Sequence, residues 1–286
     1  MPARRILPLI LLIALLLPCL ALAENDGYGV ITPAENMFQP EASGTDTPSS
    51  SAQSADIQPF APETLEKKVI GADNRTVITS PSTYPYSAIA YMEMEFSCGC
   101  EATGSGFMVS KNCLMTAAHC LVCQDHEGTV SGITMYFGFK SKKNYLLRYN
   151  DAATYWYSNS YHPSRNVYDS DWDYAYIQLR KDVGNTTGWF GMTSLSDASA
   201  ATAFMEVSGY RLGKIQTSYG TMSVLNDKRF YHYADTEPGY SGCPVFNSDY
   251  YVVAINIAHS LYYEENIARR ITRELIDDMR GNGMFD

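Results

Sequence analysis

The sequence predicts an all-β protein that ends in a single helix. From about residue 87 onward, short runs of β-branched and aromatic residues alternate with turn-forming residues. The 22 tyrosines suit strands that are buried on one side. Many short strands at this spacing are typical of a sandwich or of barrels. The runs are Ser87–Phe96, Gly106–Val109, Leu114–Ala117, Gly132–Phe137, Tyr145–Tyr149, Tyr174–Leu179, Ala203–Val207, Thr221–Leu225, Phe230–Tyr233 and Tyr250–Ala258.

The helix is predicted over about residues 270–280. Its apolar residues recur at helical spacing, which gives it one buried face. Thr272 can cap its first turn, and Gly281 can end it. The residues at helical spacing are Ile271, Leu275, Ile276 and Met279.

Residues 1–23 are typical of a secretory signal peptide. Arg4 and Arg5 precede the apolar run Ile6–Ala23, which ends in a small-x-small cleavage site. A membrane anchor is the weaker alternative, because Pro8 and Pro18 interrupt the run. We therefore expect a secreted, extracellular protein that has no membrane contact after signal cleavage.

Residues 24–68 differ in composition, because Pro, Ser, Thr, Ala and Gly dominate there. Such a segment buries too little apolar surface to fold alone. It ends in Lys67-Lys68, and a dibasic pair beside a disordered stretch is an accessible cleavage site. We expect a propeptide over 24–68 that is removed before Val69, although a solvated linker would have the same composition. Residues 69–286 would then form the folded domain.

The charge of the chain argues against one class of partner. The whole chain has a formal net charge of −10, and residues 69–286 remain mildly acidic. Proteins that bind nucleic acid present a basic face, so we expect no nucleic-acid partner. The sequence also contains no glycine-rich motif for a nucleotide phosphate, and we expect no cofactor.

Six cysteines lie beyond the leader, and an even number in an exported chain is typical of disulfide bonds. Their connectivity does not follow from the sequence. Cys98-x-Cys100 together with Cys120-x-x-Cys123 would also suit a four-thiolate zinc site. An oxidising compartment favours paired thiols, so we expect disulfides and no metal. The six are Cys98, Cys100, Cys113, Cys120, Cys123 and Cys243.

A serine between two glycines is the first candidate for chemistry. Ser241 follows Gly239 by two residues, and Gly242 and a proline come after it. Gly239 permits a backbone shape that other residues find costly, so its N–H and that of Ser241 can point at one spot. A hydroxyl acts as a nucleophile when a base takes its proton, and the resulting oxyanion needs such donors. Taken alone, the turn is also typical of an ordinary loop.

Two other segments offer a base and an acid that orients it. His119 follows an apolar run that resembles a strand, and Asp173 opens the apolar run Tyr174–Leu179. A buried carboxylate needs a partner, and an imidazole N–H would serve. The carboxylate would in turn fix the tautomer of the ring. Taken singly, His119 is compatible with a structural role, and Asp173 with a turn cap beside Asp169 and Asp171.

Together the three blocks resemble the signatures of chymotrypsin-like serine peptidases. The blocks are Thr116-Ala117-Ala118-His119-Cys120, Asp173-Tyr174-Ala175-Tyr176-Ile177 and Gly239-Tyr240-Ser241-Gly242-Cys243-Pro244. Their order, His then Asp then Ser, is that of the family. The resemblance covers residues 69–286 and implies two six-stranded antiparallel β-barrels, at about 69–185 and 186–265, before the helix. It also implies that a protein or peptide substrate lies in the cleft between the barrels.

Within that family the chain resembles the bacterial glutamyl-endopeptidase branch. Val69-Ile70-Gly71-Ala72-Asp73-Asn74-Arg75-Thr76 is similar to the mature N-terminus of that branch, and Asp235-Thr236 precedes the serine as it does there. The branch implies that the new amine of Val69 and the hydroxyl of Thr236 receive an acidic side chain. Where the branch has a pocket histidine, this chain has Asn256, which cannot become a cation. Trypsin and the glutamyl branch both have an acid at Asp235, so this residue leaves the cleavage specificity open.

The family also implies a disulfide bridge from the cysteine after the catalytic histidine to a cysteine upstream. Cys120 fits the first position. Its partner would be Cys98 or Cys100, and Cys123 would take the other. The family position of the partner is occupied by Gly104, so an extra loop is expected.

We therefore expect a secreted serine endopeptidase that is made as a proprotein and acts as a monomer. Ser241 attacks the peptide carbonyl, His119 carries its proton to the leaving amine, and Asp173 orients His119. The N–H groups of Gly239 and Ser241 stabilise the oxyanion, so neither a metal nor another cofactor is required. Tyr240 stands where animal relatives have an aspartate that pairs with the freed N-terminus, so that switch is expected to be absent.

Two other classes of function remain as alternatives. The first is a catalytically inactive relative that binds a partner through the same cleft, although such proteins usually lack a member of the triad. The second is a structural secreted β-protein in which the three blocks coincide by chance.

Overall fold

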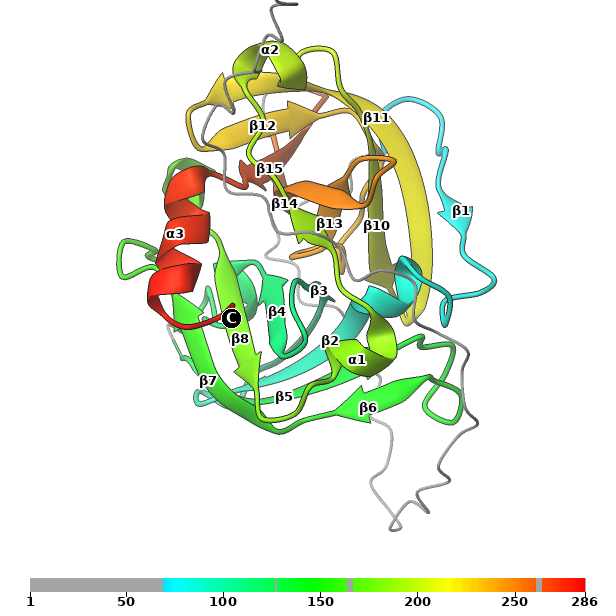
Figure 1. The fold of residues 1–286 in the computed structure, drawn as a ribbon, viewed down its shortest axis with the longest axis vertical. Helices are drawn as coiled ribbons and strands as arrows, with labels where there is room; N and C mark the ends of the chain where they lie inside the picture. The colour runs from blue at the N-terminus through cyan, green and yellow to red at the C-terminus, as the bar shows by residue number, and fades with distance from the viewer. Residues whose placement is uncertain (1–68, 127, 164–166, 261–263, 286) are drawn as a thin grey trace, which may run out of the picture.

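The computed structural model describes residues 69–126, 128–163, 167–260 and 264–285. The expected signal peptide (1–23) and propeptide (24–68) lie outside these residues. The described chain forms two β-sheets, one above the other, and the helix near the C-terminus lies at their side (Figure 1). The predicted all-β fold with a C-terminal helix is confirmed. Among the described residues, no helix has the length and apolar character needed to cross a membrane.

The first sheet contains seven antiparallel strands in the order β6-β5-β2-β3-β4-β8-β7. No pairing between described residues joins its two outer strands, so this barrel is open along one seam. The prediction of six strands is therefore off by one here. The strands are β2 (Ile89–Phe96), β3 (Glu101–Met108), β4 (Cys113–Thr116), β5 (Val130–Phe137), β6 (Leu147–Tyr149), β7 (Ala152–Tyr157) and β8 (Ala175–Leu179).

The second sheet closes into a barrel of six strands. They follow the order β11-β10-β13-β14-β15-β12, and β12 pairs back with β11. Two short strands join from outside: β1 pairs with β11, and β9 runs parallel to β14. The strands are β1 (Thr76–Val77), β9 (Gly191–Met192), β10 (Phe204–Arg211), β11 (Lys214–Asn226), β12 (Arg229–His232), β13 (Pro244–Phe246), β14 (Tyr251–His259) and β15 (Asn266–Arg270).

Strand β15 lies beyond the expected end of the second barrel near residue 265. All five of its residues are buried, including Arg269 and Arg270. The guanidinium of Arg270 reaches the backbone oxygens of Asn226 and Leu195, which satisfies its donors inside the protein. A buried strand that ends in two arginines has no apolar pattern, which is why the runs in the sequence do not include it.

The C-terminal helix α3 (Arg273–Gly281) begins three residues later than predicted, because Arg270 still belongs to β15. The Thr272 hydroxyl accepts the N–H of Leu275 at 3.3 Å, as expected of a cap. The predicted apolar face of the helix is buried. The short helices are η1 (Tyr86–Ala88), η2 (Ala118–Cys120), η3 (Val167–Trp172), α1 (Gly184–Thr187) and α2 (Asp197–Ala200).

Aromatic side chains join the two barrels. Tyr91 of β2 stacks on Phe139, with 4.9 Å between the ring centroids, and Tyr210 of β10 lies 5.7 Å from Tyr91. The Tyr210 hydroxyl also accepts the backbone N–H of Phe139 at 3.1 Å. Because one buried cluster contains residues of both sheets, the barrels meet in a continuous core that can hold a site assembled from both.

Candidate active site

His119 and Asp173 are positioned by two neighbouring strands. Strands β4 and β8 are antiparallel partners, and Thr116 at the end of β4 lies opposite Ala175 at the start of β8. His119 follows on η2, and Asp173 lies two residues before β8. The Nδ1 atom of His119 is 2.7 Å from Oδ2 of Asp173, and the backbone N–H of His119 donates to Oδ1 at 3.0 Å. One carboxylate therefore holds both the ring and the main chain of His119.

The charge of Asp173 alters the acidity of the imidazole. Burial alone would lower the pKa of His119, because it disfavours the charged ring. The attraction of Asp173, with a contribution from the neighbouring Cys120, outweighs burial and holds the pKa of His119 well above its usual 6.5. The pair is thus suited to stabilise an imidazolium that forms when His119 accepts a proton.

Asp171 has a different role from Asp173, although it lies two residues away. Its carboxylate forms an ion pair with Nε of Arg229 at 2.6 Å and accepts a hydrogen bond from Asn226 at 3.2 Å. Its backbone oxygen accepts Nε of Arg269 at 2.6 Å. These partners belong to the second barrel, so Asp171 connects η3 to that barrel. Asp173, not Asp171, binds His119.

The turn that carries Ser241 is shaped by glycines. Gly239 and Gly242 adopt φ angles of +104° and +81°, in the region that favours glycine. A Cβ on Gly242 would lie 2.1 Å from the Thr116 hydroxyl oxygen, so only glycine lets the turn approach the first barrel this closely. Within the described chain, no backbone hydrogen bond uses the N–H of Gly239 or of Ser241. Both donors are therefore available to an oxyanion.

Ser105 on β3 connects this turn to the first barrel, and the sequence analysis missed it. Its hydroxyl donates to the carbonyl of Gly239 at 2.8 Å and accepts the N–H of Tyr210 at 2.9 Å. Its backbone N–H donates to the carbonyl of Ser241 at 2.8 Å. Ser105 is fully buried, and its partners are more than a hundred residues away in sequence. The only local signal is a serine between two glycines in a strand.

Ser241 and His119 come from different barrels, and the turn that carries Ser241 lies against the residue after His119. The carbonyl of Ser241 lies 3.8 Å from the sulfur of Cys120, the residue after His119. Within the described residues, no hydrogen bond joins the Ser241 hydroxyl to the His119 ring. Such bonds are often long in free enzymes and shorten when substrate binds. The structure thus brings Asp173 and His119 into contact and places the serine turn against the next residue of η2.

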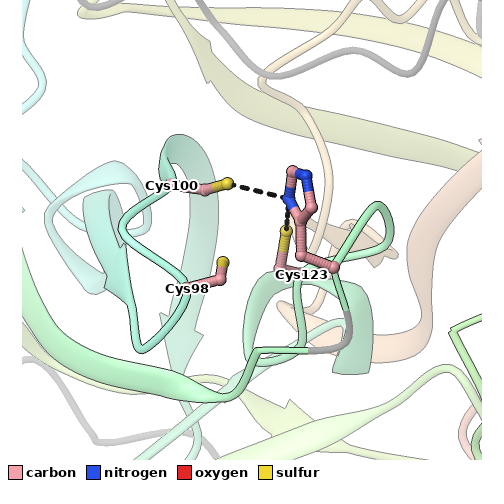
Figure 2. A group of neighbouring side chains, drawn as sticks. Cys98, Cys100 and Cys123 are labelled. Carbon is pink, nitrogen blue, oxygen red and sulfur yellow. Dashed lines mark hydrogen bonds between the residues drawn. The ribbon is translucent and has the colours of Figure 1, made fainter.

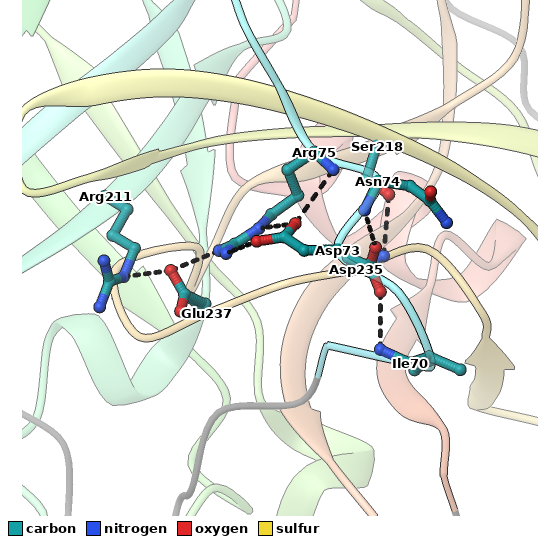
Figure 3. A network of polar contacts seen from close by, with 8 residues as sticks. All are labelled: Ile70, Asp73, Asn74, Arg75, Arg211, Ser218, Asp235 and Glu237. Atoms are coloured by element: carbon teal, nitrogen blue, oxygen red, sulfur yellow. Dashed lines mark hydrogen bonds and ion pairs between the residues drawn. The ribbon is translucent and has the colours of Figure 1, made fainter.

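The expected specificity residue Asp235 is buried and anchors the N-terminal segment (Figure 3). Its two carboxylate oxygens accept the backbone N–H groups of Ile70 at 2.7 Å and of Asn74 at 2.8 Å. The N–H of Asp235 donates to the Ser218 hydroxyl at 2.9 Å. Val69, the residue before Ile70, is half-buried. Both oxygens of Asp235 are therefore occupied by the backbone of this chain.

A second contact holds the same segment. Glu237 forms ion pairs with Arg75 and with Arg211 (Figure 3). Tyr240, which stands where animal relatives have an aspartate, is fully buried, and its hydroxyl has no hydrogen-bond partner in the described structure. The N-terminal segment thus binds Asp235 and Glu237.

Asn256 is paired with a histidine that the sequence analysis overlooked. Its Oδ1 lies 3.0 Å from Nε2 of His232, and its Nδ2 donates to the carbonyl of Tyr240 at 3.2 Å. Burial lowers the pKa of His232 to about 4, so its ring is neutral near pH 7. Thr236 is buried as well. His259 is the buried last residue of β14.

The expected disulfide bond of Cys120 is not confirmed, and all six cysteines of the described residues are free thiols. The Cys120 sulfur turns toward the Ser241 carbonyl, and the position that faces it on β3 is Gly104. A Cβ on Gly104 would lie 3.1 Å from that sulfur. Gly104 thus occupies the position from which a cysteine could bridge to Cys120, and it has no thiol. Cys98 and Cys100 instead lie beside Cys123 and a histidine (Figure 2).

Comparisons with known proteins agree with this geometry. Residues 104–255 match the model of the trypsin-like peptidase domain. An "Extracellular metalloprotease" of Bacillus subtilis is 28% identical over 229 residues, which cover 76% of this chain and 71% of that protein. A "Glutamyl endopeptidase" of Bacillus licheniformis is 27% identical over 185 residues, which cover 63% of this chain and 55% of that protein.

A solved structure of a Glu endopeptidase in complex with MPD superposes with a TM-score of 0.64 at 21% identity. The match covers 76% of this chain and all of the other. The segment that matches the family model spans more than half of the chain and contains His119, Asp173 and Ser241. The chain therefore belongs to the trypsin-like peptidase family and is a serine endopeptidase.

Proposed function

We propose that this chain cleaves peptide bonds through a triad of Ser241, His119 and Asp173 and a covalent acyl-enzyme. The observation that carries the proposal is the pair of bonds from Asp173 to His119, beside a serine turn whose N–H donors are free. A base fixed by a carboxylate, a nucleophile and an oxyanion site are the parts that acyl transfer needs.

The chemistry proceeds in two halves. The Ser241 oxygen attacks the peptide carbonyl carbon, and its proton passes to Nε2 of His119. The N–H groups of Gly239 and Ser241 hold the oxyanion. The C–N bond then breaks as His119 returns the proton to the leaving amine. Water attacks the acyl-enzyme with His119 again as base, which releases the acid and restores the Ser241 hydroxyl.

We further propose that the enzyme is exported and that cleavage after Lys68 matures it. The support is the basic and apolar leader, the Lys67-Lys68 pair, and the docked segment that begins just after it. Cleavage would create a new amine on Val69. The next residue, Ile70, donates its backbone N–H to the carboxylate of Asp235. The N-terminal sequence of the protein recovered from the culture medium tests this, with Val69 expected as the first residue.

The preferred substrate is proposed to have an acidic side chain before the cut. A basic side chain would have to compete with two backbone N–H groups for Asp235. An acidic side chain would bind the cationic amine of Val69 and the hydroxyl of Thr236. The similarity to a glutamyl endopeptidase favours the same choice. A mixed peptide library treated with protein matured at Val69 should be cut after Glu or Asp, and cutting mainly after Lys or Arg would refute the proposal.

The nucleophile is tested with a fluorophosphonate label, which reacts only with an activated serine. The label should attach to Ser241 in the native protein and should be lost in Ser241→Ala. The matched control is Ser248→Ala, at an exposed serine in the turn after β13. A folded protein that resists the label would instead support the inactive, partner-binding alternative.

A further inference from the structure

Four side chains that suit a metal ion gather at one end of the first barrel (Figure 2). Cys98 and Cys100 lie in the turn between β2 and β3, and Cys123 and His126 lie in the loop that follows η2. Their ligand atoms all lie within 4.8 Å of one another. The Nδ1 atom of His126 points at two of the sulfurs, 3.1 Å from Cys100 and 3.8 Å from Cys123.

The main chain holds the two loops in place. In the first loop, the N–H of Phe96 donates to the carbonyl of Cys100, and the N–H of Gly99 donates to Phe96, both at 2.9 Å. In the second, the N–H of Cys123 donates to the carbonyl of Gly128 at 2.8 Å. The four side chains are therefore presented by two closed turns.

A close contact between the loops keeps the cluster together. The N–H of Ser97 donates to the carbonyl of Thr129 at 2.9 Å. A Cβ on Gly128 would lie 2.8 Å from the Cys98 sulfur and 2.9 Å from its backbone nitrogen. The second loop can approach the first this closely because Gly128 lacks a side chain.

We propose that Cys98, Cys100, Cys123 and His126 bind one structural zinc ion. Three thiolates and an imidazole form a complete tetrahedral set for Zn²⁺, with Zn–S near 2.3 Å and Zn–N about 2.0–2.1 Å. Such a set leaves no open position for water, which is the mark of a structural site. Zinc replaces the thiol protons as it binds, so the ion enters as the thiols deprotonate.

Disulfide chemistry accounts for the cluster less well than zinc does. Three cysteines can form one disulfide and must leave the third thiol unpaired, whereas zinc uses all three. A disulfide also gives no role to His126, whose ring nitrogen faces two sulfurs. The sequence analysis considered four thiolates with Cys120 in this role. The structure turns Cys120 toward Ser241 and places His126 at the fourth position, so the expectation of no metal is replaced.

The site would fasten the segment that follows the catalytic histidine. The family resemblance implies a disulfide from Cys120 to β3, and here the facing residue is Gly104. Cys123 lies three residues after Cys120. The zinc ion would connect it to Cys98 and Cys100, which directly precede β3. The ion would thus link the same two segments as the bridge of the family. The ligands themselves are observed independently of the proposed catalytic function.

Metal analysis of the full protein, purified from cells grown with zinc in the medium, tests the proposal. We expect about one zinc ion per chain. The variants Cys123→Ser and His126→Ala should lower zinc content by about tenfold or more. The matched controls are Cys113→Ala, at a buried cysteine of β4 outside the cluster, and His162→Ala, at an exposed histidine. Both should retain the ion.

Two further measurements do not depend on catalysis or on the folding of any one variant. Replacement of zinc by Co²⁺ in the native protein should give the intense thiolate-to-cobalt absorption of a tetrahedral sulfur-rich site. Removal of zinc by a chelator should lower the melting midpoint by about 5 °C or more, and added zinc should restore it. Zinc below about a tenth of an ion per chain in folded native protein would overturn the proposal. A disulfide among the three cysteines, seen by mass spectrometry, would overturn it as well.

Discussion

At the scale of single residues, Asp173 does more than neighbouring acids because it binds both the ring and the main chain of His119. Asp173→Asn keeps the size of the side chain but removes its charge and favours the wrong tautomer of the ring. In the triad of chymotrypsin-like serine peptidases, the same change lowers kcat by about four orders of magnitude. We expect a similar loss here, measured as kcat on a peptide substrate.

Asp171→Asn is the matched control, because the carboxylate of Asp171 binds Arg229, and Asp173, not Asp171, binds His119. It should change kcat by less than about tenfold, even if it lowers stability. A larger loss in Asp171→Asn than in Asp173→Asn would show that the roles of the two acids are exchanged.

In the proposed mechanism, the raised pKa of His119 sets the pH dependence of the enzyme. His119 must be neutral to take the proton of Ser241, and Asp173 stabilises the charged ring, so its pKa lies above 6.5. As pH falls through that pKa, the ring gains a proton and kcat/KM falls. The acid limb of kcat/KM should therefore lie above pH 6.5, and it should move to lower pH in Asp173→Asn, where burial remains and the attraction is gone.

The profile is measured as kcat/KM against pH on a neutral peptide. His162→Ala removes an exposed histidine outside the site and should leave the limb in place. An acid limb at or below pH 6.5 in the native enzyme would contradict the expected effect of Asp173.

At the scale of elements, strand β3 holds the turn of the proposed nucleophile through Ser105. Ser105→Ala would leave the carbonyl of Gly239 and the N–H of Tyr210 without this buried partner, at a cost of about 1–3 kcal/mol in the free energy of unfolding. Because the turn also positions Ser241, kcat should fall by about 10- to 100-fold while KM changes little. Steady-state kinetics and the melting midpoint measure the two effects.

Ser131→Ala is the control for this prediction, since Ser131 is an exposed serine of β5 with one bond to a backbone oxygen. A lower melting midpoint with an unchanged kcat would show that Ser105 stabilises the fold but does not position Ser241.

At the scale of the whole molecule, short motifs made the fold predictable and indicated three candidate site residues. His119, Asp173 and Ser241 each lie in a block whose local chemistry is visible in the sequence. Ser105 and His232 were missed because their partners are brought to them by the packing of distant strands. His126 was missed for the same reason, since nothing around it in the sequence shows that two cysteines of another loop face it.

The contact between Asp235 and the segment that begins at Val69 bears on how activity is controlled. Asp235 binds the backbone of Ile70 and Asn74, and the Ser241 turn has its glycine-dependent shape. Under the proposed maturation, cutting after Lys68 would add a positive charge at Val69, next to a contact with Asp235 that is already formed. Under that proposal, latency of the precursor would come from obstruction of the site or from the missing charge.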